Sequence, residues 1–213
     1  ISYEVIEYNP GDVFPEDVDI IIGGGGQDSG QGRIQDDLLK IAPKLRKLAS
    51  NGVPMLVVCG LYQLFGNSFE TASGEKIKGI GIFRGVKTIG GSQRMIGNIV
   101  ENSDQFGEII GYENHSGKTY LSEHVKPLAK VKIGAGNLPD GEFEGACYKN
   151  VIGTYLHGSL LPKNPEISLF LIEQALKNKD YDMPKILYGN IRKANLLKRI
   201  TNNAREIAKK CPR

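Results

Sequence analysis

The first third of the chain alternates strand-like runs with a long helical pattern, and this alternation constrains the fold more than any other feature. Asp19–Ile22 is a short apolar run that leads into four glycines, and Val53–Val58 is a second uncharged run. Between them, Asp28–Ser50 places apolar residues at helical spacing, namely Ile34, Leu38, Ile41, Leu45 and Leu48. Strands that alternate with helices build a parallel sheet. The sequence therefore predicts an α/β fold with a mainly parallel sheet covered by helices.

Further strands are predicted at the start and in the middle of the chain. Ser2–Tyr8 alternates polar and apolar residues and is expected to form a strand. Gly79–Ile89, Gln93–Glu101 and Phe143–Tyr155 are short strand-like runs that contain several glycines. We expect antiparallel additions to the sheet there. Pro43, inside the long helical pattern, predicts either a kink or the start of a second helical segment.

The end of the chain is predicted to be helical. Pro165 suits the first position of a helix that Asn164 can cap, and one face of this helix is apolar, with Ile167, Phe170, Leu171 and Leu176. A last helix is expected over Gly189–Lys210. We therefore divide the chain into a main domain, residues 1–178, and a helical basic C-terminal extension, residues 179–213.

The charge pattern excludes some classes of protein. The net charge is +3, which is too small to indicate a nucleic-acid binder. The basic residues gather in Lys185–Lys210, but not in a stripe with interleaved aromatic residues. This tail is interpreted either as a solvated helix face or as a docking surface for a partner or an anionic membrane. No run approaches the roughly 18 apolar residues that an integral membrane segment needs.

The three cysteines, Cys59, Cys147 and Cys211, are widely spaced and form no Cys-x-x-Cys motif. This pattern predicts a reducing compartment and neither a disulfide framework nor a zinc site. Cys147 lies in an alternating strand and is expected in the core, and Cys211 lies in the basic tail without an evident role.

Cys59 is the candidate nucleophile because it directly follows a buried strand and precedes Gly60 and a short helix. A strand-to-helix turn holds a side chain clear of the sheet at its carboxyl end, where open α/β sheets place their sites. The helix N-terminus favours a thiolate, and the amide of Gly60 points to where an oxyanion would form. The alternative is that Cys59 is a small buried hydrophobic residue.

A thiol nucleophile needs a proton acceptor, and histidine suits this role because its pKa lies near 6.5. His157 ends the β-rich run Val151–Leu156 and precedes a glycine, so it can reach over the edge of the sheet. His124 lies in a charged segment and is expected at the surface. A hydrogen-bonded structural role remains the alternative for His157.

The glycine run Gly23–Gly26 fits neither the dinucleotide-binding pattern nor the phosphate-binding pattern that ends in Gly-Lys-Ser/Thr. Glycines can instead expose backbone amides to a developing oxyanion, which would pair this loop with Gly60. A plain flexible turn is the alternative.

Taken together, four segments resemble those of the class I glutamine amidotransferases, and more narrowly the cobyric acid synthase-like branch. They are Gly24–Asp28, Cys59–Gly66, Gly111–Gly117 and Thr154–Gly158. Within the branch, the chain is most similar to the glutaminase subunits of lipid II isoglutaminyl synthases, through Glu113–Leu121 among other segments. The resemblance covers Ser2 to about Leu176 and implies a three-layer α/β fold. It also implies a strand and a helix before Ser2, whose absence would leave an apolar edge exposed.

Carried over by position, the resemblance implies that Cys59 is the nucleophile and His157 the general base. Arg94 matches the residue that holds substrate glutamine by its α-carboxylate, which a guanidinium group suits. Gln63 matches a pocket residue, and the amides of Gly25 or Gly26 and of Gly60 match an oxyanion hole. His115 matches a motif position that is not the base and is interpreted as structural.

Two departures from the wider family concern the candidate dyad. Many class I amidotransferases have glycine two residues on either side of the cysteine, where this chain has Val57 and Leu61, so a looser or differently packed turn is expected. The usual His-x-Glu is His157-Gly158-Ser159, so the acid that orients the imidazole is missing. We hypothesise that a partner subunit supplies it.

The implied function is hydrolysis of L-glutamine to supply ammonia to a separate Mur ligase-like synthetase. That partner would use ATP and magnesium to amidate D-glutamate of lipid II, in peptidoglycan synthesis at the cytoplasmic face of the plasma membrane. No metal or cofactor is expected on this chain, and lipid II would be reached through the partner. The alternatives are another cobyric acid synthase-like amidotransferase, a cysteine hydrolase of the same fold, or a non-catalytic scaffolding domain.

Overall fold

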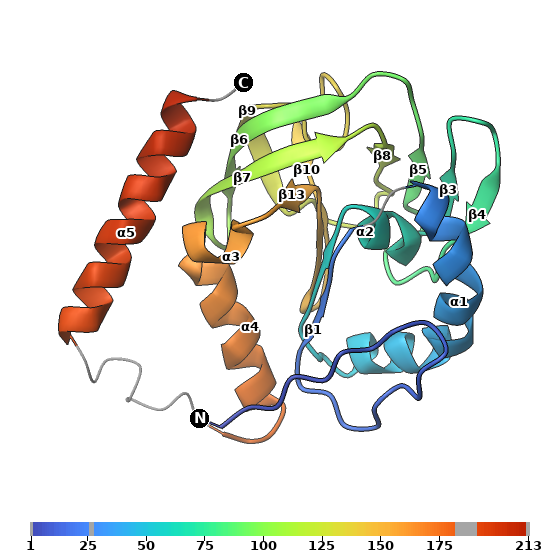
Figure 1. Cartoon of the computed structure of the whole chain (residues 1–213), viewed down its shortest axis with the longest axis horizontal. Helices are drawn as coiled ribbons and strands as arrows, with labels where there is room; N and C mark the ends of the chain where they lie inside the picture. Colours follow the sequence, from blue (N-terminus) through green and yellow to red (C-terminus); the bar gives the residue numbers. More distant parts are fainter. Residues whose placement is uncertain (1, 26–27, 182–190, 212–213) are drawn as a thin grey trace.

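The computed structural model describes residues 2–25, 28–181 and 191–211, and its centre is a four-stranded sheet (Figure 1). The strand order is β1-β2-β12-β11, with bounds Ile21–Gly23, Met55–Val58, Val151–Thr154 and Ala146–Tyr148. β1, β2 and β12 run parallel, and β11 is added antiparallel at one edge. The predicted mainly parallel sheet with an antiparallel addition is confirmed.

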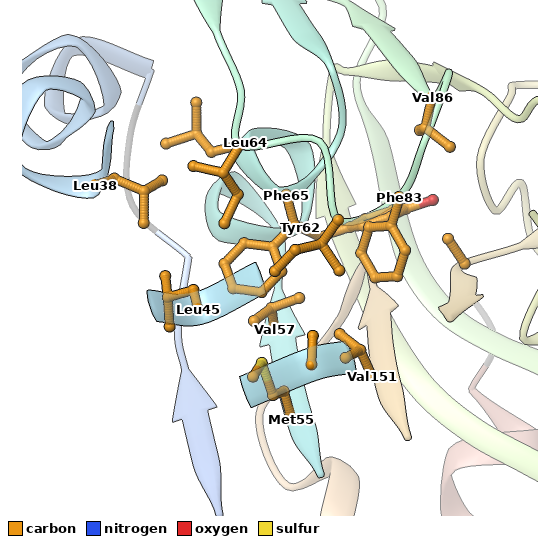
Figure 2. Packing of buried hydrophobic residues seen from close by; sticks show 14 of the residues in the cluster. Leu38, Leu45, Met55, Val57, Tyr62, Leu64, Phe65, Phe83, Val86 and Val151 are labelled. Carbon is orange, nitrogen blue, oxygen red and sulfur yellow. The ribbon is translucent and has the colours of Figure 1, made fainter. Parts of the chain in front are cut away.

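Alternate residues of β2 point to opposite faces of this sheet, and each face is covered. Met55 and Val57 pack in a core with helices α1 (Asp28–Ser50) and α2 (Gly60–Phe65), as Figure 2 shows. Leu56 instead joins a second core, on the other face, with residues of helices α3 (Leu160–Lys163) and α4 (Pro165–Lys177). Helices therefore lie on both faces, as the three-layer fold requires.

Most of the antiparallel strands form two further sheets. One has the order β10-β9-β6-β7-β13, with bounds Phe143–Glu144, Ala129–Ile133, Met95–Ser103, Gly107–His115 and Leu156–His157. The other has the order β4-β3-β5-β8, with bounds Lys76–Lys78, Ser68–Glu70, Lys87–Ile89 and Lys118–Tyr120. The expected antiparallel strands are confirmed, but beyond β11 they do not extend the central sheet.

Two local predictions were wrong. Ser2–Tyr8 pairs with none of the described strands, and its Tyr3 and Val5 are 87% and 81% exposed. Alternation alone makes no strand without a neighbouring edge to bond to. Only the end of Gly79–Ile89 is a strand, because Gly81 and Gly85 adopt positive φ and turn the chain. The helix that contains Pro43 continues unbroken to Ser50, so no second segment begins there, and the kink stays a prediction.

Asn164 precedes α4 as predicted, and Pro165 occupies its first turn, but the Asn164 side chain does not cap the helix. Its Oδ1 accepts from the backbone N–H of Ile110, and its Nδ2 donates to the carbonyls of Ile110 and Leu160. The amide therefore satisfies backbone groups of β7 and α3 instead of those of α4.

Ile22 on edge strand β1 is 60% exposed. Among the described residues, no helix has the length and apolar character that crossing a bilayer requires.

The C-terminal helix α5 (Ile191–Lys210) packs on the main domain through its second half. Ala208 is buried against Val100 and Ile110, and Arg205 donates to the carbonyls of Lys163 and Glu108. Leu197, Ile200 and Ile207 on the same helix remain exposed. Part of the basic tail thus contacts the domain, and the boundary at residue 178 stays a prediction.

Arg205→Ala should loosen α5 from the domain, because its guanidinium satisfies several acceptors at a largely buried position. Hydrogen bonds of charged groups contribute about 1.5–3 kcal/mol, so amide exchange in residues 201–208 should accelerate at least about tenfold. Hydrogen–deuterium exchange of peptides from α5 and β6 measures this. Arg199→Ala, at an exposed position, is the control, and equal exchange in both variants would contradict the anchoring role.

Candidate active site

Cys59 occupies a strained turn between β2 and α2 at the carboxyl end of the parallel sheet. Its φ and ψ are 54° and −114°, values that a residue with a side chain adopts at a cost of about 1–3 kcal/mol. The backbone N–H of Cys59 donates to the carbonyl of Thr154 at 2.9 Å. The backbone N–H of Gln63 donates to the carbonyl of Cys59, and this bond forms the first turn of α2. The predicted strand–turn–helix is confirmed.

The glycine-rich loop packs directly against this turn. A Cβ atom added to Gly25 would lie 2.5 Å from the Cβ of Cys59 and 3.3 Å from both its Sγ and the Gly60 nitrogen. A Cβ added to Gly23 would lie 2.0 Å from Leu61 Cδ2. A side chain at position 25 would therefore collide with Cys59, and one at position 23 would displace the Leu61 side chain. Whether the turn is packed differently from that of other class I amidotransferases stays a prediction. Gly26 lies outside the described residues.

His157 lies at the same end of the sheet as Cys59. Thr154, which accepts the Cys59 N–H, is the last residue of β12, and His157 follows it by three residues on β13, opposite Tyr112 of β7. Three residues span at most about 10 Å. The Nδ1 atom of His157 is buried and has no hydrogen-bond partner among the described residues.

His115 is buried on β7, and its ring stacks on the ring of Tyr155 with centroids 3.6 Å apart. Its Nδ1 donates to the carbonyl of Gly117 at 3.0 Å. Burial lowers the pKa of His115 to about 4, although this hydrogen bond opposes the shift, and the nearby His157 and Arg94 lower it further. His115 is therefore a neutral, fixed ring near pH 7, in keeping with a structural role.

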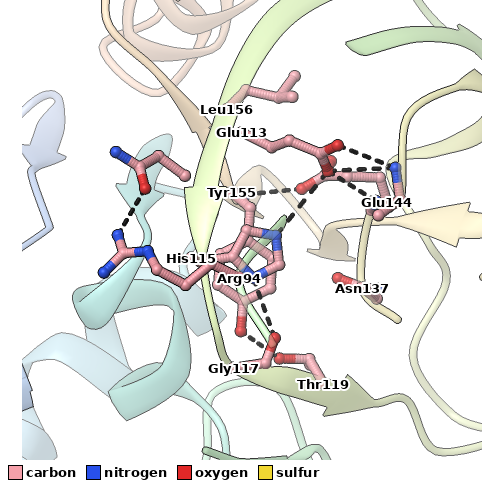
Figure 3. Close-up of polar contacts among 12 residues, drawn as sticks. Arg94, Glu113, His115, Gly117, Thr119, Asn137, Glu144, Tyr155 and Leu156 are labelled. Carbon is pink, nitrogen blue, oxygen red and sulfur yellow. Dashed lines mark hydrogen bonds and ion pairs between the residues drawn. The ribbon is translucent and has the colours of Figure 1, made fainter. Parts of the chain in front are cut away.

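Arg94 is exposed just before β6, and its Nη2 donates to Asn114 Oδ1 at 2.5 Å (Figure 3). The Asn114 side chain points to the same face of β7 as Tyr112, which is the partner of His157, so the guanidinium lies on the His157 face of the hairpin and His115 on the opposite face. The remaining donors of the fork are available for an anionic group.

Gln63 on α2 is buried, and its Nε2 donates to the hydroxyl of Tyr155 at 3.2 Å. That hydroxyl also bonds Thr119 Oγ1 at 2.6 Å, and Thr119 bonds Thr88 at 2.7 Å. This chain of hydrogen bonds ties the turn at Cys59 to strands β5 and β8. Whether the Gln63 amide also contacts a substrate stays a prediction.

Comparison with known protein families now identifies the chain. Residues 2–165 match the model of the CobB/CobQ-like glutamine amidotransferase domain. The chain belongs to this family. It is 41% identical over 181 residues to the lipid II isoglutaminyl synthase (glutamine-hydrolyzing) subunit GatD of Staphylococcus aureus, covering 84% of this chain and 73% of that protein.

Further relatives and solved structures agree with the family. The GatD subunit of Streptococcus pneumoniae is 39% identical and covers 76% of this chain, which spans 62% of that protein. A probable cobyric acid synthase of Methanosphaera stadtmanae is 31% identical, over 67% of this chain and 31% of its own length. A crystal structure of a glutamine amidotransferase superposes with a TM-score of 0.56 at 17% identity, over 75% of this chain and 80% of that one, which shows the fold alone.

His124 is at the surface as predicted, whereas Cys147 packs against the second core but is not fully buried. Cys147 is half-buried on β11, and burial, with the charge of Glu144, raises the pKa of its thiol to about 12, so it is a poor nucleophile. Cys211 is exposed. His124 is exposed beside Glu123. In the described ranges, no group of histidine, cysteine and acidic side chains could hold a metal ion.

Sequence reasoning missed three fully buried carboxyl groups behind the site, Glu101, Glu113 and Glu144. Glu113 accepts from the backbone N–H groups of Ala135 and Gly136, and its Oε2 lies 3.9 Å from His115 Nε2. Neither oxygen of Glu101 has a hydrogen-bond partner among the described residues. Burial raises the pKa of Glu101 well above its ordinary value, and Glu144 and Glu113 raise it further.

Glu101→Gln should flatten the pH dependence of stability. The folded chain keeps the Glu101 proton at pH values where the unfolded chain has released it, so stability falls as pH rises above the ordinary pKa of 4.5. Urea midpoints at about pH 5 and about pH 8 should therefore differ less in Glu101→Gln than in the wild type. The exposed Glu123→Gln is the control, and an unchanged difference in Glu101→Gln would contradict the protonated carboxyl.

Proposed function

We propose that this amidotransferase domain hydrolyses L-glutamine with Cys59 as nucleophile and His157 as general base, and supplies ammonia to a synthetase that amidates lipid II. One observation carries the proposal. The Cys59 N–H bonds to Thr154, three residues before His157, while Gly25 packs against the thiol. A thiol, an imidazole and glycine amides at one end of an α/β sheet are the parts that acyl transfer to cysteine needs.

In the proposed reaction, the Cys59 thiolate attacks the side-chain amide carbon of glutamine. The amides of Gly60 and of Gly25 or Gly26 stabilise the resulting oxyanion, at about 3–4 kcal/mol per well-placed donor. His157 gives a proton to the leaving nitrogen, and ammonia departs from the thioester. His157 then removes a proton from water, which attacks the thioester and releases glutamate and the free thiol.

Substrate binding is assigned to Arg94 and Gln63. The exposed guanidinium of Arg94, held at one corner by Asn114, suits the α-carboxylate of glutamine. Gln63 lies beneath the turn, and its contact with Tyr155 fixes its orientation. No step of this reaction calls for a metal or cofactor on this chain.

The partner is inferred from the relatives. Two of them are named as glutamine-hydrolyzing subunits of lipid II isoglutaminyl synthase, so we assign this chain the same place in a complex. The other subunit would be Mur ligase-like and use ATP and magnesium to amidate the D-glutamate carboxylate of lipid II. The reaction would take place in the cytoplasm at the inner face of the plasma membrane, as a step of peptidoglycan synthesis.

Cys59→Ala should abolish glutamine-dependent amidation of lipid II by the complex, at least about a thousandfold, because the thioester cannot form. Amidation with ammonium salts should stay at the wild-type rate, since the synthetase needs only ammonia. Product formation is followed by mass spectrometry, with Cys147→Ala as the matched control.

Loss of both activities in Cys59→Ala would assign the cysteine a structural role and contradict the proposal. Covalent labelling of Cys59 by 6-diazo-5-oxonorleucine separates the alternatives further. A cysteine hydrolase of peptides would not react with this glutamine mimic, and a scaffolding domain would stay unlabelled even in the complete complex. Another cobyric acid synthase-like amidotransferase would be labelled but would not support lipid II amidation.

A partner-supplied acid for His157 is the second part of the proposal. The Nδ1 of His157 lacks a hydrogen-bond partner among the described residues, which supports an acceptor from outside the chain. Because this atom is buried in the isolated chain, binding of the partner must also expose it.

Glutamine turnover by the isolated chain should therefore rise at least about tenfold when the synthetase is added without its own substrates, since the imidazole gains its orienting acid. Glutamate release, measured with and without the synthetase, tests this. Equal turnover in the two samples would refute the shared site.

A further inference from the structure

We infer that Glu144 is a positioning residue of the active site, because its buried carboxyl fixes the strand corner from which both Cys59 and His157 are held. The inference rests on the proposed roles of these two residues. It concerns how the chain sets their relative position.

The chain crosses between the central sheet and the β6–β7 sheet at two corners that lie side by side. At the first, Glu144 ends β10 and Ala146 begins β11, with Gly145 between them at a φ of 68°. At the second, Thr154 ends β12 and Leu156 begins β13. Ala146 pairs with Gly153 across the sheet, which brings the two corners together.

The first corner is held by Asn137. Its Nδ2 donates to the carbonyl of Gly145 at 2.9 Å, and its Oδ1 accepts from the Gly145 N–H at 3.1 Å. Asn137 Oδ1 also accepts from the hydroxyl of Tyr62. Because Asn137 holds both backbone groups of Gly145, it also fixes the backbone of the preceding residue, Glu144.

The second corner is held by the Glu144 side chain. Its Oε1 accepts from Thr154 Oγ1 at 2.9 Å and from the backbone N–H of Tyr155 at 2.6 Å (Figure 3). Thr154 Oγ1 in turn accepts from the Leu156 N–H at 3.0 Å. All four residues are fully buried, so water does not replace the carboxyl, and its loss leaves buried donors unsatisfied.

This corner connects to both members of the proposed dyad. The carbonyl of Thr154 accepts the Cys59 N–H, and His157 lies two residues beyond Tyr155. The Tyr155 ring stacks on His115, and its hydroxyl accepts from Gln63. A shift at the corner would therefore move the thiol and the imidazole relative to each other.

The corner requires a hydrogen-bond acceptor oxygen at this position, and the side chain of glutamine also has one. Glu144 Oε2 has no hydrogen-bond partner among the described residues. Burial raises the pKa of Glu144 to about 8, and the charge of Glu113 adds to this rise. The hydrogen bonds from Tyr155 and Thr154 oppose it, so the carboxyl is largely neutral at pH 7. Glu144→Gln keeps both acceptor contacts, and Glu144→Leu removes them at similar size.

The experiment compares these variants in the full complex with the synthetase, by steady-state glutamine hydrolysis and by ammonia-dependent amidation. Glu144→Leu should lower kcat at least about tenfold and change KM for glutamine by a smaller factor, since both reacting groups move while, of the two binding residues, only Gln63 contacts the corner. Ammonia-dependent amidation should be unchanged. Glu144→Gln should restore kcat to within about threefold of the wild type, and the exposed Glu142→Leu is the control.

Wild-type kcat in Glu144→Leu overturns the inference, and so does an equal loss in Glu144→Gln, because the acceptor contacts would then not be what matters. If Glu144→Leu does not fold, Thr154→Val removes the hydroxyl that bonds Glu144 and the Leu156 N–H but keeps the bond from Tyr155 to Glu144. It should lower kcat about three- to thirtyfold, and a wild-type kcat there also overturns the inference. Cys59→Ala in the same assay separates this result from the proposed function. Glutamine-dependent activity in that variant would reject the dyad itself, whatever Glu144 does.

Discussion

The hydrogen bond from the Cys59 N–H to the Thr154 carbonyl is the contact on which the rest of the site depends. It extends the parallel pairing of β2 with β12 by one residue beyond Val58 and Thr154, into the turn. The two strands are separated in sequence by residues 59–150, yet their carboxyl ends meet at one edge because they run parallel. The strained backbone of Cys59 is held between this bond and the first turn of α2.

Behind this edge lies a layer of buried polar side chains. Glu113, Glu144, His115 and Asn137 are all buried between the central sheet and the β6–β7 sheet. Buried polar groups cost free energy unless they are hydrogen-bonded. Most of these bonds go to backbone groups that the sheets leave unpaired where strands end or change sheet. The layer therefore fixes the positions of strand ends, and Cys59 and His157 lie at such ends.

The family relationship covers the part of the chain that carries this site. The amidotransferase match ends at residue 165, and α5 lies beyond it. α5 nevertheless contacts β7 through Arg205 and Lys209, both beside Glu108. Other residues of α5, both basic and apolar, are exposed. The basic tail can therefore still be interpreted either as a solvated helix face or as a docking surface.

Local patterns in the sequence determined the long helix, the strands on either side of it, the turn at Cys59 and the strand end at His157. Each depends on spacing or on neighbours within a few residues, which is where such patterns act. They could not determine that Ser2–Tyr8 lacks a pairing partner, because a strand exists only against another edge. They also could not show that Asn164 bonds to β7 or that Glu144 bonds to Tyr155. The sequence does not show whether a glutamate is exposed to water or accepts a hydrogen bond from a buried backbone N–H. Only the packing of the two sheets determines which environment Glu144 has.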